Sequence, residues 1–158
     1  MRINDQKTAA PGQRVRILVA DDSNDDQAIV RLAFEQAGVA AELEFVNNGE
    51  ELLQYLQAGH THSLESTSRP VPDLLLLDLG MPGRDGFQVL EWLQTRPAFA
   101  RMPVIVFSGS DQPVDINRAL SLGAVRYLVK PQKMPDMVQL VRGIEKFWQK
   151  LRANSAAS

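Results

Sequence analysis

The chain has 158 residues, of which 44% are hydrophobic and 23% are charged, and its formal net charge at pH 7 is −2. This length suits one domain with a sizeable core, while the near-neutral charge gives no basic surface for nucleic acid and no bulk attraction to a membrane. The chain contains no cysteine, which excludes disulfide bonds and cysteine-ligated metal sites.

The N-terminal residues 1–14 are polar and include Pro11-Gly12, so we expect them to form a flexible leader. They lack the apolar core of a signal peptide, and no apolar run in the chain is long enough to cross a bilayer. Together with the absence of cysteine, these features favour a cytoplasmic protein.

After the leader, short apolar runs alternate with amphipathic stretches. Ser23 suits the N-cap of the first helix and Asn48 that of the second, each followed three residues later by an acidic residue. Ile29, Leu32 and Ala33 fall on one face of the first helix. The first half of the chain is therefore predicted to contain a strand at 15–20, a helix from 23 to about 39, a strand at 43–46 and a helix from 48 to about 58.

The second half begins with a polar segment at 59–72, which is longer than the usual connection. The strand at 73–78 contains four consecutive leucines, a pattern typical of a strand covered on both faces, as in a parallel sheet. The remaining predicted elements are a helix around 87–93 that closes near Pro97, a strand at 104–108, a helix at 113–122 ended by Gly123, a strand at 125–129, and a helix from about 135 to 151 followed by a flexible tail at 152–158.

Five strands alternating with five helices predict one α/β domain at 15–151, built on a parallel sheet. In such sheets, ligands bind beyond the carboxyl ends of the strands. Four of the five strands carry polar or charged residues there: Asp21 and Asp22 after the first strand, Asp78 after the third, Ser108 at the end of the fourth, and Lys130 after the fifth.

Three carboxylates at one edge would repel each other. A hard cation with oxygen ligands, Mg²⁺ or Mn²⁺, would offset this repulsion, and Lys130 would add a positive charge suited to phosphate. An aspartate can attack phosphorus and form an acyl phosphate, so the pattern indicates phosphoryl chemistry. Each residue alone also has an ordinary explanation, as part of a turn, a helix start or a charged surface, and it is their co-occurrence that favours function.

The segments that carry these residues are VRILVADDSNDD, LLLLDLGMPGRDGFQVL, VIVFSGS and VRYLVKP. They resemble receiver domains of bacterial response regulators, the family that includes the chemotaxis protein CheY, from about Val15 to Leu151. The resemblance implies a flavodoxin-like, doubly wound sheet with strand order 2-1-3-4-5. It also implies a protein of a two-component phosphorelay that catalyses only its own phosphorylation and dephosphorylation and is not otherwise an enzyme.

The same resemblance implies where the phosphoryl group and the metal bind. Asp78 would accept the phosphoryl group from a sensor histidine kinase or a phosphotransfer protein. The metal, Mg²⁺ or Mn²⁺, would be held by Asp78, by Asp22 directly, by Asp21 through water, and by the backbone carbonyl of Gly80.

Further residues match the family's switch. Ser108 would turn towards the phosphoryl group, and Tyr127 would move inward after it. Lys130 would contact the phosphoryl group, and the peptide bond between Lys130 and Pro131 would be cis. Small residues two positions after Asp78 and Ser108 leave the predicted site open.

The expected partners follow from the same comparison. The segment 59–72 and the sequence SNDD resemble a subgroup of stand-alone receivers linked to phytochrome-type histidine kinases. The signal would leave the protein through protein–protein contacts, because only one helix follows the last strand. Phe147 and Val138 on that helix favour a homodimer.

Two other functions were weighed. A haloacid-dehalogenase-type enzyme also uses an aspartate at a strand end, but it needs a second aspartate at the position that Gly80 occupies. A pseudo-receiver, a binding module that never takes up phosphate, would not need the full set of site residues. His60 and His62 have no further ligand nearby in the sequence and are best explained as residues of a polar loop.

Overall fold

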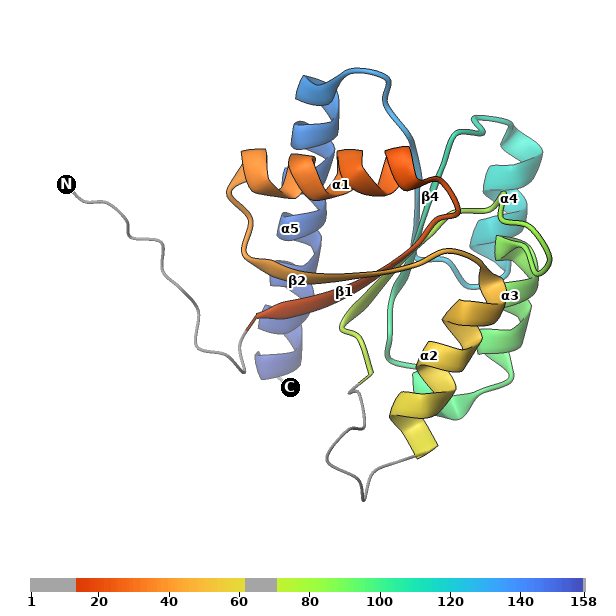
Figure 1. Cartoon of the computed structure of the whole chain (residues 1–158). Coiled ribbons are helices and arrows are strands. Elements are labelled where there is room, and N and C mark those ends of the chain that lie inside the picture. The colour runs from red at the N-terminus through yellow and green to blue at the C-terminus, as the bar shows by residue number, and fades with distance from the viewer. Residues whose placement is uncertain (1–13, 62–70, 158) are drawn as a thin grey trace.

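The computed structural model describes residues 14–61 and 71–157, and in this range five strands alternate with helices (Figure 1). The predicted leader up to residue 13, residues 62–70 of the polar segment, His62, the side chain of His60 and Ser158 lie outside what is described. The elements are β1 (Val15–Ala20), α1 (Asn24–Ala37), β2 (Ala41–Val46), α2 (Gly49–Thr61), β3 (Leu74–Leu77), α3 (Gly86–Gln94), the short 3₁₀ helix η1 (Pro97–Phe99), β4 (Val104–Ser108), α4 (Pro113–Ser121), β5 (Arg126–Val129) and α5 (Met134–Ala157).

The five strands form one parallel sheet in the order β2-β1-β3-β4-β5, which confirms the predicted topology. In register, Ala20 at the end of β1 lies beside Leu77 at the end of β3, and Ser108 at the end of β4 lies beside Val129 of β5. The carboxyl ends of these strands therefore lie along one edge of the sheet.

Helices cover both faces of the sheet, and strand residues alternate between two separate cores (Figure 1). One core, with α2, α3 and α4, takes up residues such as Leu75, Leu77 and Val106. The other core, with α1 and α5, takes up neighbours such as Leu76 and Phe107. The leucines of β3 are almost completely buried, so β3 forms the centre of the molecule, as its unbroken apolar sequence predicted.

Side chains fix the helix starts that face the carboxyl edge of the sheet. The Ser23 hydroxyl accepts a hydrogen bond from the backbone N–H of Asp26 at 3.1 Å, and the Asn48 side chain accepts one from Glu51 at 2.8 Å, as the capping patterns predicted. Asp85 forms a reciprocal capping box with Gln88 at the start of α3.

Two predictions about the helices were wrong. The buried residues of α1 are Val30, Ala33 and Phe34, whereas Ile29 and Leu32 remain 38% and 43% exposed, because the helix packs on the sheet with a face rotated from the predicted one. The last helix does not end at residue 151 but runs to Ala157, which extends helical structure into the predicted tail.

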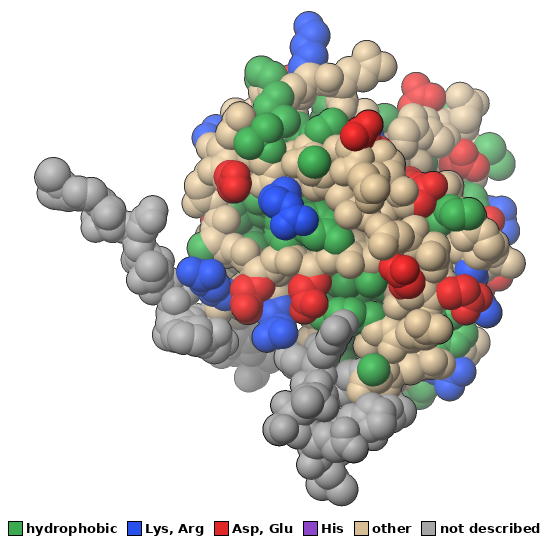
Figure 2. Space-filling view, in the orientation of Figure 1, with side chains coloured by type: hydrophobic (Ala, Val, Ile, Leu, Met, Phe, Trp, Pro, Cys, Tyr) green, Lys and Arg blue, Asp and Glu red, His purple; other side chains and the backbone are tan. Residues whose placement is uncertain are grey.

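On the face shown in Figure 2, acidic and basic side chains are interspersed, and no continuous basic surface forms there. Within residues 14–61 and 71–157, no helix combines the length and the hydropathy needed to span a bilayer.

Candidate functional site

Backbone hydrogen bonds place the predicted site residues at the sheet edge. The N–H of Asp78 donates to Ala20 in β1 at 3.0 Å, and the N–H of Lys130 donates to Ser108 in β4 at 2.8 Å. The ends of β1, β3, β4 and β5 are thereby tied together. This fixed frame brings side chains from four distant parts of the chain to the same edge.

Three carboxylates converge at that edge. Asp21, Asp22 and Asp78 each offer an oxygen, and these oxygens all lie within 4.8 Å of one another. Asp21 and Asp78 are buried, at 2% and 8% exposed, while Asp22 faces solvent. A set of hard oxygen donors, open to solvent on one side, fits Mg²⁺ or Mn²⁺, which retain water ligands when bound to proteins.

The two acidic residues after β1 differ in what surrounds them. One oxygen of Asp21 accepts the backbone N–H of Ser23 at 2.9 Å, and the other accepts the ammonium of Lys130 at 2.8 Å. Both oxygens of Asp21 therefore already have protein partners. Asp22 is the more accessible of the two.

Lys130 reaches into the acidic cluster from the end of β5. Its Nζ atom lies 2.8 Å from Asp21, 2.7 Å from Asp26 and 3.6 Å from Asp78, and its side chain is only 15% exposed. Asp26, in the first turn of α1, was not among the predicted site residues. Its spacing from Ser23 accounts for Asp26 as part of a capping pattern, and no local sequence pattern places it beside Lys130.

Burial and the neighbouring charges act in opposite directions on the two central groups. Burial raises the pKa of Asp78 above its ordinary value; Lys130 and the backbone N–H of Gly80 lower it, and Asp21 and Asp22 raise it further. Burial by itself lowers the pKa of Lys130, but hydrogen bonds to Asp21 and Asp26 outweigh burial and hold that pKa well above its ordinary value. Lys130 is therefore a permanent cation, whereas the negative charge on Asp78 is costly.

Ser108 and Tyr127 do not share a direct hydrogen bond but meet at the backbone of Ser110. The Ser108 hydroxyl accepts the N–H of Ser110 at 3.2 Å, and the Tyr127 hydroxyl donates to the Ser110 carbonyl at 2.8 Å. The Ser110 side chain donates to Asp115 of α4 at 2.6 Å. The loop between β4 and α4 thus connects both predicted switch residues to α4.

The loop after β3 leaves space on one side of Asp78 and none on the other. A Cβ atom added at Gly80 would meet nothing within 4 Å, whereas one added at Gly86 would lie 2.6 Å from the backbone oxygen of Asp78. Gly80 thus lies in open space, whereas Gly86 packs closely against the end of β3.

Comparison with known proteins identifies the family. Residues 17–142 match the model of the response regulator receiver domain. The chain belongs to this family.

Among its relatives, the response regulator Rcp1 of Synechocystis sp. is 32% identical over 132 residues, which cover 84% of this chain and 87% of Rcp1. The crystal structure of RPA3017, a response regulator in red light signaling of R. palustris, has a TM-score of 0.76 and 35% identity, and covers 85% of this chain and 93% of that protein. The phosphorylated cyanobacterial phytochrome response regulator RcpA has a TM-score of 0.74 and 32% identity, with coverage of 86% and 94%.

One prediction about the receiver site is contradicted. The peptide bond between Lys130 and Pro131 is trans, since the described residues contain no cis peptide bond. The trans form is the intrinsically favoured one for a bond before proline. With this trans bond, the Lys130 side chain still reaches Asp21 and Asp26.

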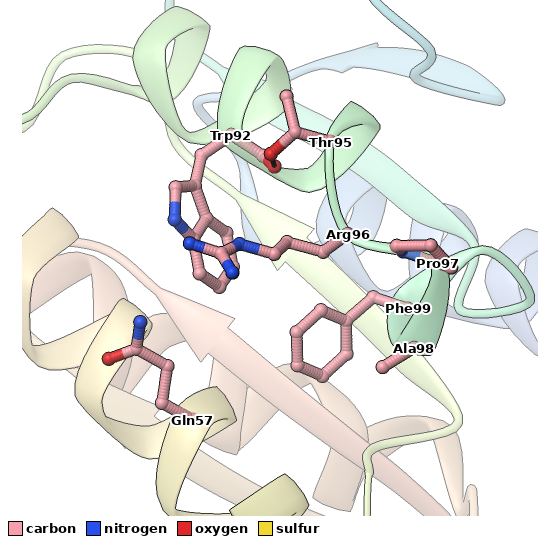
Figure 3. A pocket seen from close by; sticks show the side chains of 7 residues that line it. All are labelled: Gln57, Trp92, Thr95, Arg96, Pro97, Ala98 and Phe99. Atoms are coloured by element: carbon pink, nitrogen blue, oxygen red, sulfur yellow. Dashed lines mark hydrogen bonds between the residues drawn. The ribbon is translucent and has the colours of Figure 1, made fainter.

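One cavity lies beside an aromatic cluster, away from the receiver site (Figure 3). It has a volume of about 840 Å³ and lies between α2 and the segment from α3 to η1. The guanidinium of Arg96 stacks over the ring of Trp92 at 4.9 Å, and Trp92 lies 5.8 Å from Phe99. None of the predicted site residues lines it, so it takes no part in the chemistry at the strand ends.

Proposed function

We propose that this receiver domain accepts a phosphoryl group on Asp78 from a sensor histidine kinase, or from a phosphotransfer protein, in a reaction that requires Mg²⁺ or Mn²⁺. The observation that carries the proposal is the position of Asp78, which is enclosed at the sheet edge between two further carboxylates and the ammonium of Lys130. An arrangement of this kind suits phosphoryl transfer, where catalysis is mainly positioning and neutralisation of charge.

In this reaction, a carboxylate oxygen of Asp78 forms a bond to phosphorus while the phosphorus–nitrogen bond of a phosphohistidine breaks. Asp22, Asp21, Asp78 and the carbonyl of Gly80 would hold the cation, which when bound supplies positive charge for the phosphoryl oxygens. Lys130 supplies the second positive charge from the β5 side.

Phosphorylation then acts through the loop after β4. To donate to a phosphoryl oxygen, the Ser108 hydroxyl turns towards Asp78 and gives up the N–H of Ser110. Because Tyr127 and Asp115 also bind Ser110, this movement changes the support of α4 and of the Tyr127 ring. The receiver would therefore have two states of the α4 and β5 surface, with phosphorylation favouring one of them.

The partners follow from the relatives. RcpA is described as a phytochrome response regulator, and RPA3017 as acting in red light signaling. A sensor kinase of the phytochrome type is therefore the proposed phosphoryl donor, and the proposed output is a protein–protein contact made by the domain itself, in the cytoplasm.

We also propose a homodimer, but on a different surface from the one that the sequence suggested. Val138 is buried in the core with α1, and Phe147 is half-buried beneath the guanidinium of Arg126, so neither is an exposed contact. Four exposed apolar residues lie instead on α4 and around the edge strand β5, namely Val114, Leu120, Val125 and Val129, whereas on α5 Leu151 is 38% exposed.

The phosphoacceptor is tested by incubating the full chain with Mg²⁺ and acetyl phosphate and measuring the intact mass. One phosphoryl group per chain is expected for the wild type, and none for Asp78→Asn. Asp73→Asn serves as the matched control, because Asp73 precedes the same strand at the opposite edge of the sheet. Its labelling should equal that of the wild type.

The outcomes also separate the alternatives. Release of phosphate with continuous turnover would indicate an enzyme of the dehalogenase type, and the absence of any adduct, with either acetyl phosphate or a phosphorylated kinase, would indicate a pseudo-receiver. Equal labelling of wild type and Asp78→Asn would refute Asp78 as the acceptor.

A further inference from the structure

We infer that Asp26 is a positioning residue for Lys130. Its carboxylate holds the ammonium at the side of the site next to α1 and keeps it from forming a hydrogen bond with the unphosphorylated Asp78. This inference rests on the proposed function, because it concerns how Asp78 is kept available for the cation and for phosphorus. It adds a residue to the site that the sequence analysis did not include.

The distances around the ammonium support this role. Two carboxylate oxygens lie within hydrogen-bond distance of Lys130 Nζ, at 2.8 Å for Asp21 and 2.7 Å for Asp26. The nearest oxygen of Asp78 lies at 3.6 Å, which is too far for a hydrogen bond. Two of the three N–H groups of the ammonium are taken by residues of the β1–α1 region, and these two hydrogen bonds hold Nζ too far from Asp78 for a third.

The position of Asp26 on α1 leaves its side chain available for this contact. Its backbone N–H is already satisfied by the Ser23 cap, and the preference of a helix N-terminus for negative charge is met equally by its neighbour Asp25. Asp25 is exposed, and no ion pair joins it to Lys130, whereas Asp26 is 37% exposed and pairs with it. Helix formation alone therefore does not account for the orientation of Asp26.

Removal of Asp26 would release one N–H of Lys130 towards Asp78. The ammonium would then compete with the divalent cation for the same carboxylate, so the affinity for Mg²⁺ would fall. When Asp78 carries a phosphoryl group, its oxygens attract the ammonium instead, and Lys130 exchanges Asp26 for the phosphoryl group. Asp26 thus acts only through Lys130 and touches neither the cation nor the phosphoryl group.

The test is a calorimetric titration of the full chain with Mg²⁺. Asp26→Asn is expected to bind Mg²⁺ about threefold to fivefold more weakly than Asp25→Asn, a difference within the range of partly exposed ion pairs. Both variants lose one charge from the same helical turn, so their difference separates the contact from general electrostatics. Asp26→Glu, which keeps the carboxylate, should recover most of the affinity.

A double-mutant cycle with Lys130→Gln decides whether Asp26 acts through Lys130. In the Lys130→Gln background, the further loss of affinity caused by Asp26→Asn should be smaller than in the wild type. If the two substitutions instead have additive effects on Mg²⁺ affinity, or if Asp26→Asn binds Mg²⁺ as well as Asp25→Asn, the inference is overturned.

A second readout does not depend on metal or phosphate. The ¹⁵N-labelled ammonium of Lys130 should exchange its protons with water faster in Asp26→Asn than in the wild type or Asp25→Asn, because one of its hydrogen bonds is lost. An unchanged exchange rate would contradict the role of Asp26. Neither readout requires phosphorylation. If Asp78 failed to accept phosphate, the proposed function would be refuted, and these two measurements would still decide whether Asp26 positions Lys130.

Discussion

At the scale of single residues, the site holds the carboxylate of Asp78 in surroundings that disfavour its charge. Burial raises the pKa of Asp78, and Asp21 and Asp22 raise it further, while the ammonium of Lys130 offsets only part of this effect. Lys130 has two other carboxylate partners, and both lie closer to its ammonium than Asp78 does. The negative charge on Asp78 is thus a cost to the folded state that a bound cation would relieve.

This cost predicts how stability depends on pH for Asp78→Asn. The folded state holds the Asp78 proton more tightly than the unfolded state, so ionisation above the ordinary pKa of 3.8 destabilises the wild type. In buffer with a chelator and at neutral pH, the variant should therefore be more stable, by on the order of 1 kcal/mol. The gain should shrink as the pH falls through the raised pKa towards 3.8.

Urea unfolding at neutral pH and at about pH 4 measures this difference. Asp73→Asn is the control, since Asp73 is exposed at the other edge of the sheet. A variant that is less stable than the wild type at neutral pH, or a difference that does not change with pH, would contradict the prediction.

Two glycines near Asp78 should respond very differently to alanine. At Gly86, a Cβ atom would lie 2.6 Å from the backbone oxygen of Asp78 and 2.8 Å from Leu79 Cα, neither of which can move independently of the strand end. Gly86→Ala should destabilise the fold by about 1–3 kcal/mol. Gly80→Ala meets no atom and should change the free energy of unfolding by no more than about 0.5 kcal/mol, as measured by urea unfolding without metal. Equal effects at the two positions would disprove this account.

At the scale of elements, α1 tests how the sheet selects the buried face of a helix. Val30 is 3% exposed and packs in the core with α5, whereas Ile29, next to it, is 38% exposed. Val30→Ala should cost about 1.5–3 kcal/mol. Ile29→Ala should cost under about 1 kcal/mol, partly because alanine is the better helix former. Thermal unfolding measures the stability of both variants. A larger loss of stability for Ile29→Ala than for Val30→Ala would contradict the assignment of the buried face of α1.

The elements also show where sequence patterns were sufficient. The leucines of β3 and the caps at Ser23 and Asn48 depend on neighbours in the sequence, and these predictions are confirmed. The exposure of Ile29 and the burial of Val138 depend on how α1 and α5 pack on the sheet. Local sequence patterns do not determine this packing. The contact of Asp26 with Lys130 joins residues 104 positions apart, so only the fold could reveal it.

At the scale of the whole molecule, the parallel sheet and the convergence of residues at its carboxyl edge agree with the structure because both follow from alternation of strands and helices. The strand order, which the family resemblance implied, is also confirmed. The trans bond before Pro131 shows the limit of a resemblance, because that expectation came from the family and not from the residues.

The proposed dimer can be tested at this scale by analytical ultracentrifugation. Val125, beside β5, is 48% exposed, and Val125→Asp should shift the phosphorylated protein towards monomers, with a dissociation constant raised about tenfold or more, because a charge would be buried at the contact. Leu32→Asp, at a residue that is 43% exposed on α1, is the matched control and should leave association unchanged. If the wild type is monomeric at all concentrations, or if both variants weaken association equally, this surface is not the interface.

The separation of the interior into two cores has a consequence for signalling. Tyr127 packs against the core that contains residues of α3 and α4, whereas the Lys130 ammonium lies 5.8 Å from the ring of Phe107, a residue of the other core, and pairs with Asp26 of α1. Asp78 stands between them, where the sheet ends and the two halves of the molecule meet. A phosphoryl group on Asp78, as proposed above, would therefore change the contacts on both sides of the sheet at the same time. One protein bound to α1 and another bound to α4 would then respond to the same phosphorylation without contacting each other.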